Sequence, residues 1–113
     1  LATRLPELAV EIHGNLHLES AYVAEQLLLC IQEGISNALR HGNAKNIQLH
    51  LHQDNNQIHI DIDDHGIGCF PSFKPGNGLI GMQERLAQFN GHVELIPREI
   101  GCRLSIALEI KNA

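Results

Sequence analysis

Hydrophobic and polar residues alternate along two neighbouring segments of this chain. Residues 46–52 (NIQLHLH) and residues 57–63 (QIHIDID) place an aliphatic residue at every second position, and the polar stretch QDNN separates them. Alternation with a period of two is typical of strands that bury one face. The two segments therefore predict a β-hairpin whose aliphatic residues point into a core and whose histidines and aspartates point to solvent.

A helical period of apolar residues precedes this hairpin, and another follows it. The first helix is predicted from about Tyr22 to His41, with Ser20 as its N-cap and Gly42 as its stop. The second is predicted at about residues 79–90 and ends at Gly91. The apolar stripes that these helices turn to the core are Leu27, Leu28, Ile31, Ile35, Ala38 and Leu39 in the first, and Leu79, Met82, Leu86 and Phe89 in the second.

Three more alternating segments, at residues 9–13, 92–96 and 102–109, predict further strands, and the proline-containing residues 65–77 predict a loop. The order is β, α, β, β, α, β, β. Two amphipathic helices can cover one face of a sheet. The expected fold class is therefore α+β, a two-layer α/β sandwich with a mixed, mostly antiparallel sheet covered on one face by helices.

Composition narrows the class of protein. The length of 113 residues suits a single domain, spanning residues 1–113, and the chain begins at Leu1, so we expect a fragment of a longer protein. A net charge of −5 argues against nucleic acid as a partner. No apolar run approaches the roughly 20 residues of a membrane span, so we expect no direct membrane contact. Three cysteines without a C-x-x-C motif favour a reducing cytoplasm.

Residues 76–81 (GNGLIG) match G-x-G-x-x-G, a pattern that holds dinucleotides in Rossmann folds. That interpretation requires a strand directly before the glycines and a βαβ unit around them. A loop with prolines precedes Gly76, and the helix after it leads into an antiparallel hairpin. The context therefore does not favour a Rossmann site.

Two other patterns stand upstream in a fixed order. The first predicted helix places Glu33 and Asn37 one turn apart on its polar face, and Asp64-His65-Gly66-Ile67-Gly68 forms D-x-G-x-G at a strand end. Each pattern alone has a plain explanation: a solvated helix face, a turn-forming aspartate, or close packing of a glycine such as Gly81. The three patterns together favour a nucleotide site.

In this order the patterns resemble the ATP-binding domain of sensor histidine kinases, a Bergerat-type fold shared with gyrase, chaperone and mismatch-repair ATPases. The resemblance covers about residues 8–110. The stretch GLIGMQERL and the short loop 69–77 look like the nitrate- and phosphosugar-sensor subfamily, which has a short nucleotide lid. The resemblance implies an ATP-dependent protein histidine kinase domain with ATP and Mg²⁺ as its ligands.

The chemistry of the base fits this implication. A carboxylate at Asp64 can accept the amino N–H of adenine and would repel the carbonyl of guanine, and a hydrogen bond to a charged group contributes about 1.5–3 kcal/mol. Gly66 and Gly68 let the backbone approach the ring. Cys102 stands where the family usually has a threonine that helps bind adenine, and its thiol is a weaker hydrogen-bonding group.

For the triphosphate, the resemblance implies that Asn37 supplies an oxygen to Mg²⁺ and that Glu33 is the catalytic residue, orienting the attacking group or a metal-bound water. Phosphates are expected at the start of the second helix, where free N–H groups favour anions. The residues expected there are Gly76, Gly78, Leu79 and Gly81, and His41, Arg40 and Lys74 are basic residues expected close to the phosphates.

The implied partners lie in the same full-length protein and beyond it. None of the eight histidines precedes Asp or Glu, so we expect the phosphoacceptor on separate dimerisation helices, with a response regulator receiving the phosphoryl group. The fragment is expected to be monomeric, and the full-length protein a homodimer in the cytoplasm or with this domain on the cytoplasmic side of a membrane-anchored sensor. The alternatives are an anti-sigma-factor-type serine kinase and a non-catalytic nucleotide-sensing or docking module.

The histidines of the predicted hairpin form a separate group. A four-residue loop would place His50 opposite His59, with His52 beside Gln57. Such a row could bind zinc weakly, but no cysteine completes the site, so a solvent-facing polar row is the favoured interpretation.

Overall fold

The computed structural model describes residues 9–41, 46–66 and 78–110. Five strands form one sheet in the order β1-β2-β3-β5-β4, in which β1 pairs parallel with β2 and every other pair is antiparallel. The strands are β1 (Ala9–His13), β2 (Asn46–Asp54), β3 (Gln57–Asp64), β4 (His92–Pro97) and β5 (Cys102–Glu109).

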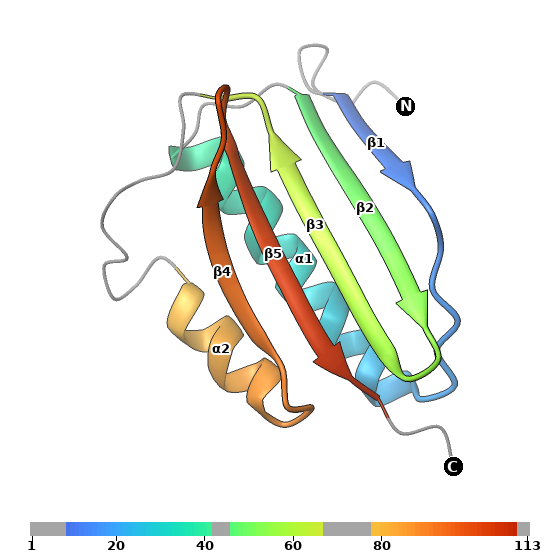
Figure 1. The fold of residues 1–113 in the computed structure, drawn as a ribbon. Coiled ribbons are helices and arrows are strands. Elements are labelled where there is room, and N and C mark those ends of the chain that lie inside the picture. The colour runs from blue at the N-terminus through green and yellow to red at the C-terminus, as the bar shows by residue number, and fades with distance from the viewer. Residues whose placement is uncertain (1–8, 42–45, 67–77, 111–113) are drawn as a thin grey trace, which may run out of the picture.

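Helices α1 (Ala21–His41) and α2 (Leu79–Ala87) lie on the same face of the sheet, and the other face is bare of helices (Figure 1). Together with the strand order, this arrangement confirms the expected α+β two-layer sandwich. The core lies between the layers and includes Ile47, Ile60 and Ile106 from the three central strands, which are almost fully buried.

Helix α1 begins where its sequence predicts, because the Ser20 hydroxyl accepts a hydrogen bond from the N–H of Val23 at 3.2 Å. The expected stripe is confirmed for Leu27, Ile31, Ile35, Ala38 and Leu39, which lie in or against the core, and it is wrong for Leu28. Leu28 is 54% exposed, whereas Cys30 is fully buried. A Cβ added to Gly34 would lie 2.6 Å from Cδ1 of Ile62, so the helix approaches the sheet most closely along the line of Cys30 and Gly34.

Helix α2 is shorter than predicted. It ends at Ala87, and Asn90 takes the left-handed conformation (φ 52°) before Gly91, whose N–H returns to the Leu86 carbonyl at 2.9 Å. Leu79, Met82 and Leu86 are buried, as their spacing predicts.

The β2–β3 hairpin has a two-residue turn, Asn55-Asn56, instead of the expected four-residue loop. The register therefore places His50 opposite Asp61 and His52 opposite His59, and the predicted facing of His50 with His59 is wrong. Asn55 supplies the left-handed conformation (φ 56°) that a tight hairpin turn requires. Within residues 9–41, 46–66 and 78–110, no group of three or more His, Cys, Asp or Glu side chains could hold a metal ion.

Candidate nucleotide site

Asp64 ends β3 on the helix-covered side of the sheet and is only 7% exposed. The N–H of Gly66 donates to Oδ1 of Asp64 at 2.9 Å, which fixes the rotamer of the carboxylate. In the sheet, Asp64 is paired with Ile47 of β2 on one side and Cys102 of β5 on the other. A carboxylate held in this way is pre-oriented for a partner that approaches the strand end.

Gly101 packs against Asp64 from the turn before β5. Its φ is +84°, and an added Cβ would lie 2.7 Å from the carbonyl carbon of Asp64 and 2.9 Å from its Oδ1. Both the backbone conformation and the space require glycine here. The next residue, Cys102, is also buried and pairs with Asp64 in the sheet.

Glu33 and Asn37 lie one turn apart on the half-buried side of α1, as predicted. The guanidinium of Arg40 contacts both side chains. Its Nη2 donates to Oδ1 of Asn37 at 3.0 Å and lies 3.4 Å from Oε2 of Glu33. The two side-chain oxygens are thus close enough to share one cation.

The start of α2 lies against Glu33. Gly78 has φ +89° and precedes the first residue of α2, and an added Cβ would overlap the Glu33 carboxylate, with Cγ at 2.6 Å. Among the described residues, no side chain caps this helix start. The structure therefore brings Glu33 of the helix pair into direct contact with Gly78 of the G-x-G-x-x-G pattern.

The remaining predicted site residues fall into three groups. Leu79 is buried in the core, so its main chain is the part that a ligand could reach. Gly81 is exposed, and an added Cβ would meet nothing within 4 Å among the described residues, so close protein packing does not explain this glycine. Gly68, Gly76 and Lys74 lie outside the described residues, and His41 ends α1 with a side chain that is not described.

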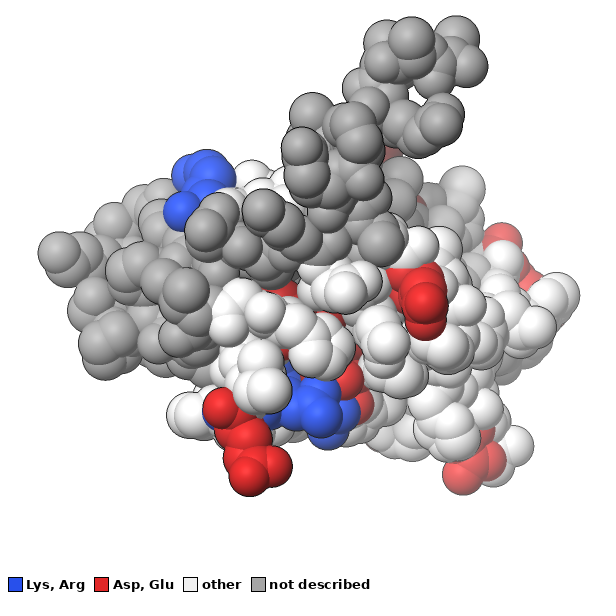
Figure 2. Space-filling view, turned by 90° about the horizontal axis from the view of Figure 1, so that it is seen from above, with Lys and Arg blue, Asp and Glu red and all other residues white. Residues whose placement is uncertain are grey.

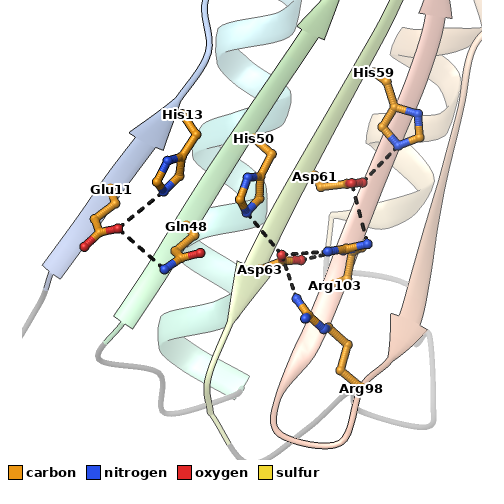
Figure 3. A network of polar contacts seen from close by, with 9 residues as sticks. All are labelled: Glu11, His13, Gln48, His50, His59, Asp61, Asp63, Arg98 and Arg103. Carbon is orange, nitrogen blue, oxygen red and sulfur yellow. Dashed lines mark hydrogen bonds and ion pairs between the residues drawn. The ribbon is translucent and has the colours of Figure 1, made fainter.

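A connected polar network covers the bare face of the sheet, and sequence reasoning did not find it (Figure 3). At its centre is Asp63, which is 2% exposed. Arg103 holds it with Nε at 2.6 Å from Oδ1 and NH2 at 2.9 Å from Oδ2, and NH1 of Arg98 lies 2.6 Å from Oδ2. Burial alone would raise the pKa of Asp63, but the hydrogen bonds and charges of Arg103 and Arg98 outweigh it and lower that pKa.

The network extends across the sheet from this centre. Nε2 of His50 lies 3.4 Å from Oδ2 of Asp63, and the His50 ring stacks on that of His13, with centroids 5.0 Å apart. Nε2 of His59 lies 3.0 Å from both Asp61 Oδ1 and Ser105 Oγ. Seen from above, basic and acidic side chains lie against one another on one side of the molecule (Figure 2). His50 and His59 are therefore members of this polar network, and the expected solvent-facing polar row is confirmed by the exposure of His52 and His59.

Neither helix of the described residues is long and apolar enough to span a lipid bilayer.

Comparisons with known proteins show the family and the fold of this chain. The family described as "Histidine kinase-, DNA gyrase B-, and HSP90-like ATPase" matches residues 22–112. The sensor histidine kinase DesK of Bacillus subtilis is 34% identical over 84 residues, and the signal transduction histidine-protein kinase/phosphatase UhpB of Salmonella typhimurium is 35% identical over 78 residues. The matches cover 73% and 68% of this chain but 22% and 15% of those proteins, so the chain corresponds to a minor part of each.

Solved structures share the fold. The ATP-binding domain of PrrB from Mycobacterium tuberculosis matches with a TM-score of 0.77 at 24% identity, covering 96% of this chain and 84% of that one. The blue-light-activated histidine kinase EL346 of Erythrobacter litoralis matches with a TM-score of 0.79 at 15% identity, covering 91% of this chain and 35% of that one.

The fold and the family match define an ATP-binding ATPase domain. The chain belongs to the family of histidine kinase-, DNA gyrase B- and HSP90-like ATPases.

Proposed function

We propose that this domain binds Mg·ATP and is the catalytic domain of a two-component sensor histidine kinase, transferring the γ-phosphoryl group to a histidine on separate dimerisation helices. The observation that carries the proposal is the carboxylate of Asp64, buried at a strand end and oriented by Gly66 and Gly101. The relatives DesK and UhpB, both histidine kinases by name, support the kinase assignment.

Asp64 is proposed to recognise the adenine base. Its Oδ1 accepts the Gly66 N–H, and this bond turns the carboxylate so that a second acceptor position is available to the exocyclic amino group of adenine. Guanine has a carbonyl at that position, and its oxygen would face a negative charge. A charged hydrogen bond contributes about 1.5–3 kcal/mol, so this one contact can select the base.

Asn37 and Glu33 are proposed to act on the metal and the transferred group. The contacts of the Arg40 guanidinium with Oδ1 of Asn37 and Oε2 of Glu33 support this proposal, because both oxygens face one positive charge. Mg²⁺ typically takes one or two protein oxygens together with phosphates and waters. When bound, Mg²⁺ would neutralise charge on the phosphates. Glu33 is proposed to orient the attacking imidazole or a metal-bound water, and Asn37 to supply a neutral ligand.

The start of α2 is proposed to receive the phosphates. Its first N–H groups have no side-chain cap, and the positive end of a helix dipole favours anions. The exposed Gly81 leaves open space on this helix. Gly66, Gly68, Gly76, Gly78, Leu79, His41 and Cys102 complete the proposed binding set.

The proposed setting follows from the kinase assignment. Residues 1–113 are proposed to form one domain of a longer, dimeric protein, which passes its phosphoryl group to a response regulator. The cytoplasm, which supplies ATP, is proposed as the compartment of this domain.

Titration calorimetry of the 113-residue chain with Mg·ATP and Mg·GTP tests the binding step. We expect saturable binding of Mg·ATP and much weaker binding of Mg·GTP. In Asp64→Asn, the affinity for ATP should fall roughly ten- to a hundredfold, and the preference over GTP should narrow, because the new amide can donate to the guanine carbonyl. An Asp64→Asn protein that is folded and binds ATP as the wild type does would remove the adenine assignment. Failure of the wild type to bind either nucleotide would favour the docking-module alternative.

A further inference from the structure

Two consecutive residues at the end of β3 hold the same turn from opposite faces of the sheet. Asp64 lies on the helix side and contacts Gly101, and Asp63 lies on the bare side and contacts Arg98. Arg98 and Gly101 are the first and last residues of the turn between β4 and β5, and the N–H of Arg98 lies 3.4 Å from the carbonyl oxygen of Gly101. The position of Gly101 against Asp64 is therefore coupled to the ion pair between Asp63 and Arg98.

Arg103 of β5 holds the same end of β3. It pairs with Asp63 in the sheet register and holds its carboxylate through two nitrogen–oxygen contacts. A carboxylate that is almost fully buried and held by two guanidiniums has little freedom to rearrange, since losing either partner would leave buried charge poorly compensated. Such a cluster fixes the backbone that carries it.

We propose that Asp63, Arg98 and Arg103 form a positioning cluster that sets the orientation of Asp64, and thereby the affinity and base selectivity of the nucleotide site. The proposal rests on the proposed function of Asp64. None of the three is assigned a contact with the nucleotide. They act through the turn 98–101, which Arg98 holds against β3 so that Gly101 packs on the backbone and carboxylate of Asp64.

A merely structural ion pair makes a different prediction. It would change the midpoint of thermal unfolding, but every molecule that remains folded would keep its preference for adenine over guanine. A positioning cluster changes that preference, because base selection depends on the direction of the Asp64 carboxylate.

The decisive variant is Arg98→Gln. Arg98 has a side chain that is 39% exposed, so its replacement opens no buried cavity. We expect the affinity for Mg·ATP to fall roughly tenfold, the scale seen when contacts behind a ligand-binding group are removed, and the ATP-to-GTP preference to fall with it. Arg98→Lys keeps the charge and should retain most of the wild-type affinity for Mg·ATP and most of the ATP-to-GTP preference. The matched control is Glu109→Gln at the far end of β5, whose carboxylate accepts hydrogen bonds from Gln57 and Asn90, and which should leave the affinity and the ATP-to-GTP preference unchanged.

A double-mutant cycle with Asp64→Asn separates direct from indirect action. If the cluster works through Asp64, Arg98→Gln should have little further effect on affinity in the Asp64→Asn background. Suppose that the wild type binds ATP. An unchanged ATP-to-GTP preference in folded Arg98→Gln, or fully additive effects in the cycle, would then overturn the positioning role and leave the proposed function standing. Absence of ATP binding by the wild type would overturn the proposed function and this inference with it.

Discussion

The backbone of Gly78 packs directly on the side chain of Glu33, joining the start of α2 to the polar side of α1. These residues are separated by the whole β2–β3 hairpin in the chain. Their contact places the helix start that is proposed to receive phosphates beside the residue proposed to act in phosphoryl transfer. A displacement of either residue should therefore disturb the other.

Gly78→Ala tests that contact. The left-handed φ of +89° would cost a non-glycine residue about 1–2 kcal/mol, and the new methyl group would collide with the Glu33 carboxylate. We expect a lower free energy of unfolding in urea and weaker binding of Mg·ATP. If the free energy of unfolding and the affinity for Mg·ATP both matched the wild type, neither the left-handed conformation nor the contact with Glu33 would contribute to stability or binding.

Gly81→Ala is its matched counterpart in the same helix. Its Cβ would meet no described atom within 4 Å, and alanine is favoured over glycine in a helix by about 0.5–1 kcal/mol. The variant should be slightly more stable than the wild type. Weaker Mg·ATP binding despite this gain would show that the position is kept open for the ligand, whereas unchanged binding would remove Gly81 from the site.

Asn37→Asp should separate ligand binding from stability. Asn37 contributes no core contact, and an aspartate could keep the interaction with Arg40 now made at 3.0 Å. The new carboxylate would stand beside the proposed triphosphate and repel it, so we expect weaker Mg·ATP binding at a nearly unchanged melting temperature. A collapsed melting temperature with intact affinity would instead make Asn37 a structural residue.

The lowered pKa of Asp63 predicts how stability depends on acid. A carboxyl group whose pKa is lower in the folded state than in the unfolded state adds stability above its unfolded pKa of about 3.9, and this contribution is lost as the pH falls through the folded value. Asp63→Asn should therefore destabilise the protein at pH 7, and its difference from the wild type should shrink below about pH 4. Urea unfolding of both proteins at pH 7 and below about pH 4 measures the difference in their free energies of unfolding. A difference that grew in acid would contradict the lowered pKa of Asp63.

The domain should not phosphorylate itself. None of its histidines is followed by an acidic residue, so the acceptor is expected elsewhere in the full-length protein. Incubation with γ-labelled ATP and Mg²⁺ should leave the chain unlabelled, with Asp64→Asn as the background control. Acid-labile label on the wild type alone would place an acceptor within these residues.

The sequence by itself determined the elements and the identity of the proposed site. Alternation in residues 46–63 and helical spacing in residues 21–41 are local consequences of which side chains must be buried, so they can be recognised without the fold. The order of Glu33 with Asn37, then Asp64, then the glycines was also readable, because the three patterns together favour a nucleotide site although each alone has a plain explanation.

Tertiary structure alone decided which residues meet. The two-residue turn at Asn55-Asn56 set the hairpin register. Gly34 packs closely against the sheet, whereas Leu28 of the same helix is exposed to solvent. The burial of Asp63 was equally hidden, since a period of two assigns it to a solvent face, whereas Arg98, Arg103 and His50 contact its carboxylate in the folded chain. Such contacts join residues far apart in the chain, and local periodicity carries no information about which distant residue a side chain will contact in the folded structure.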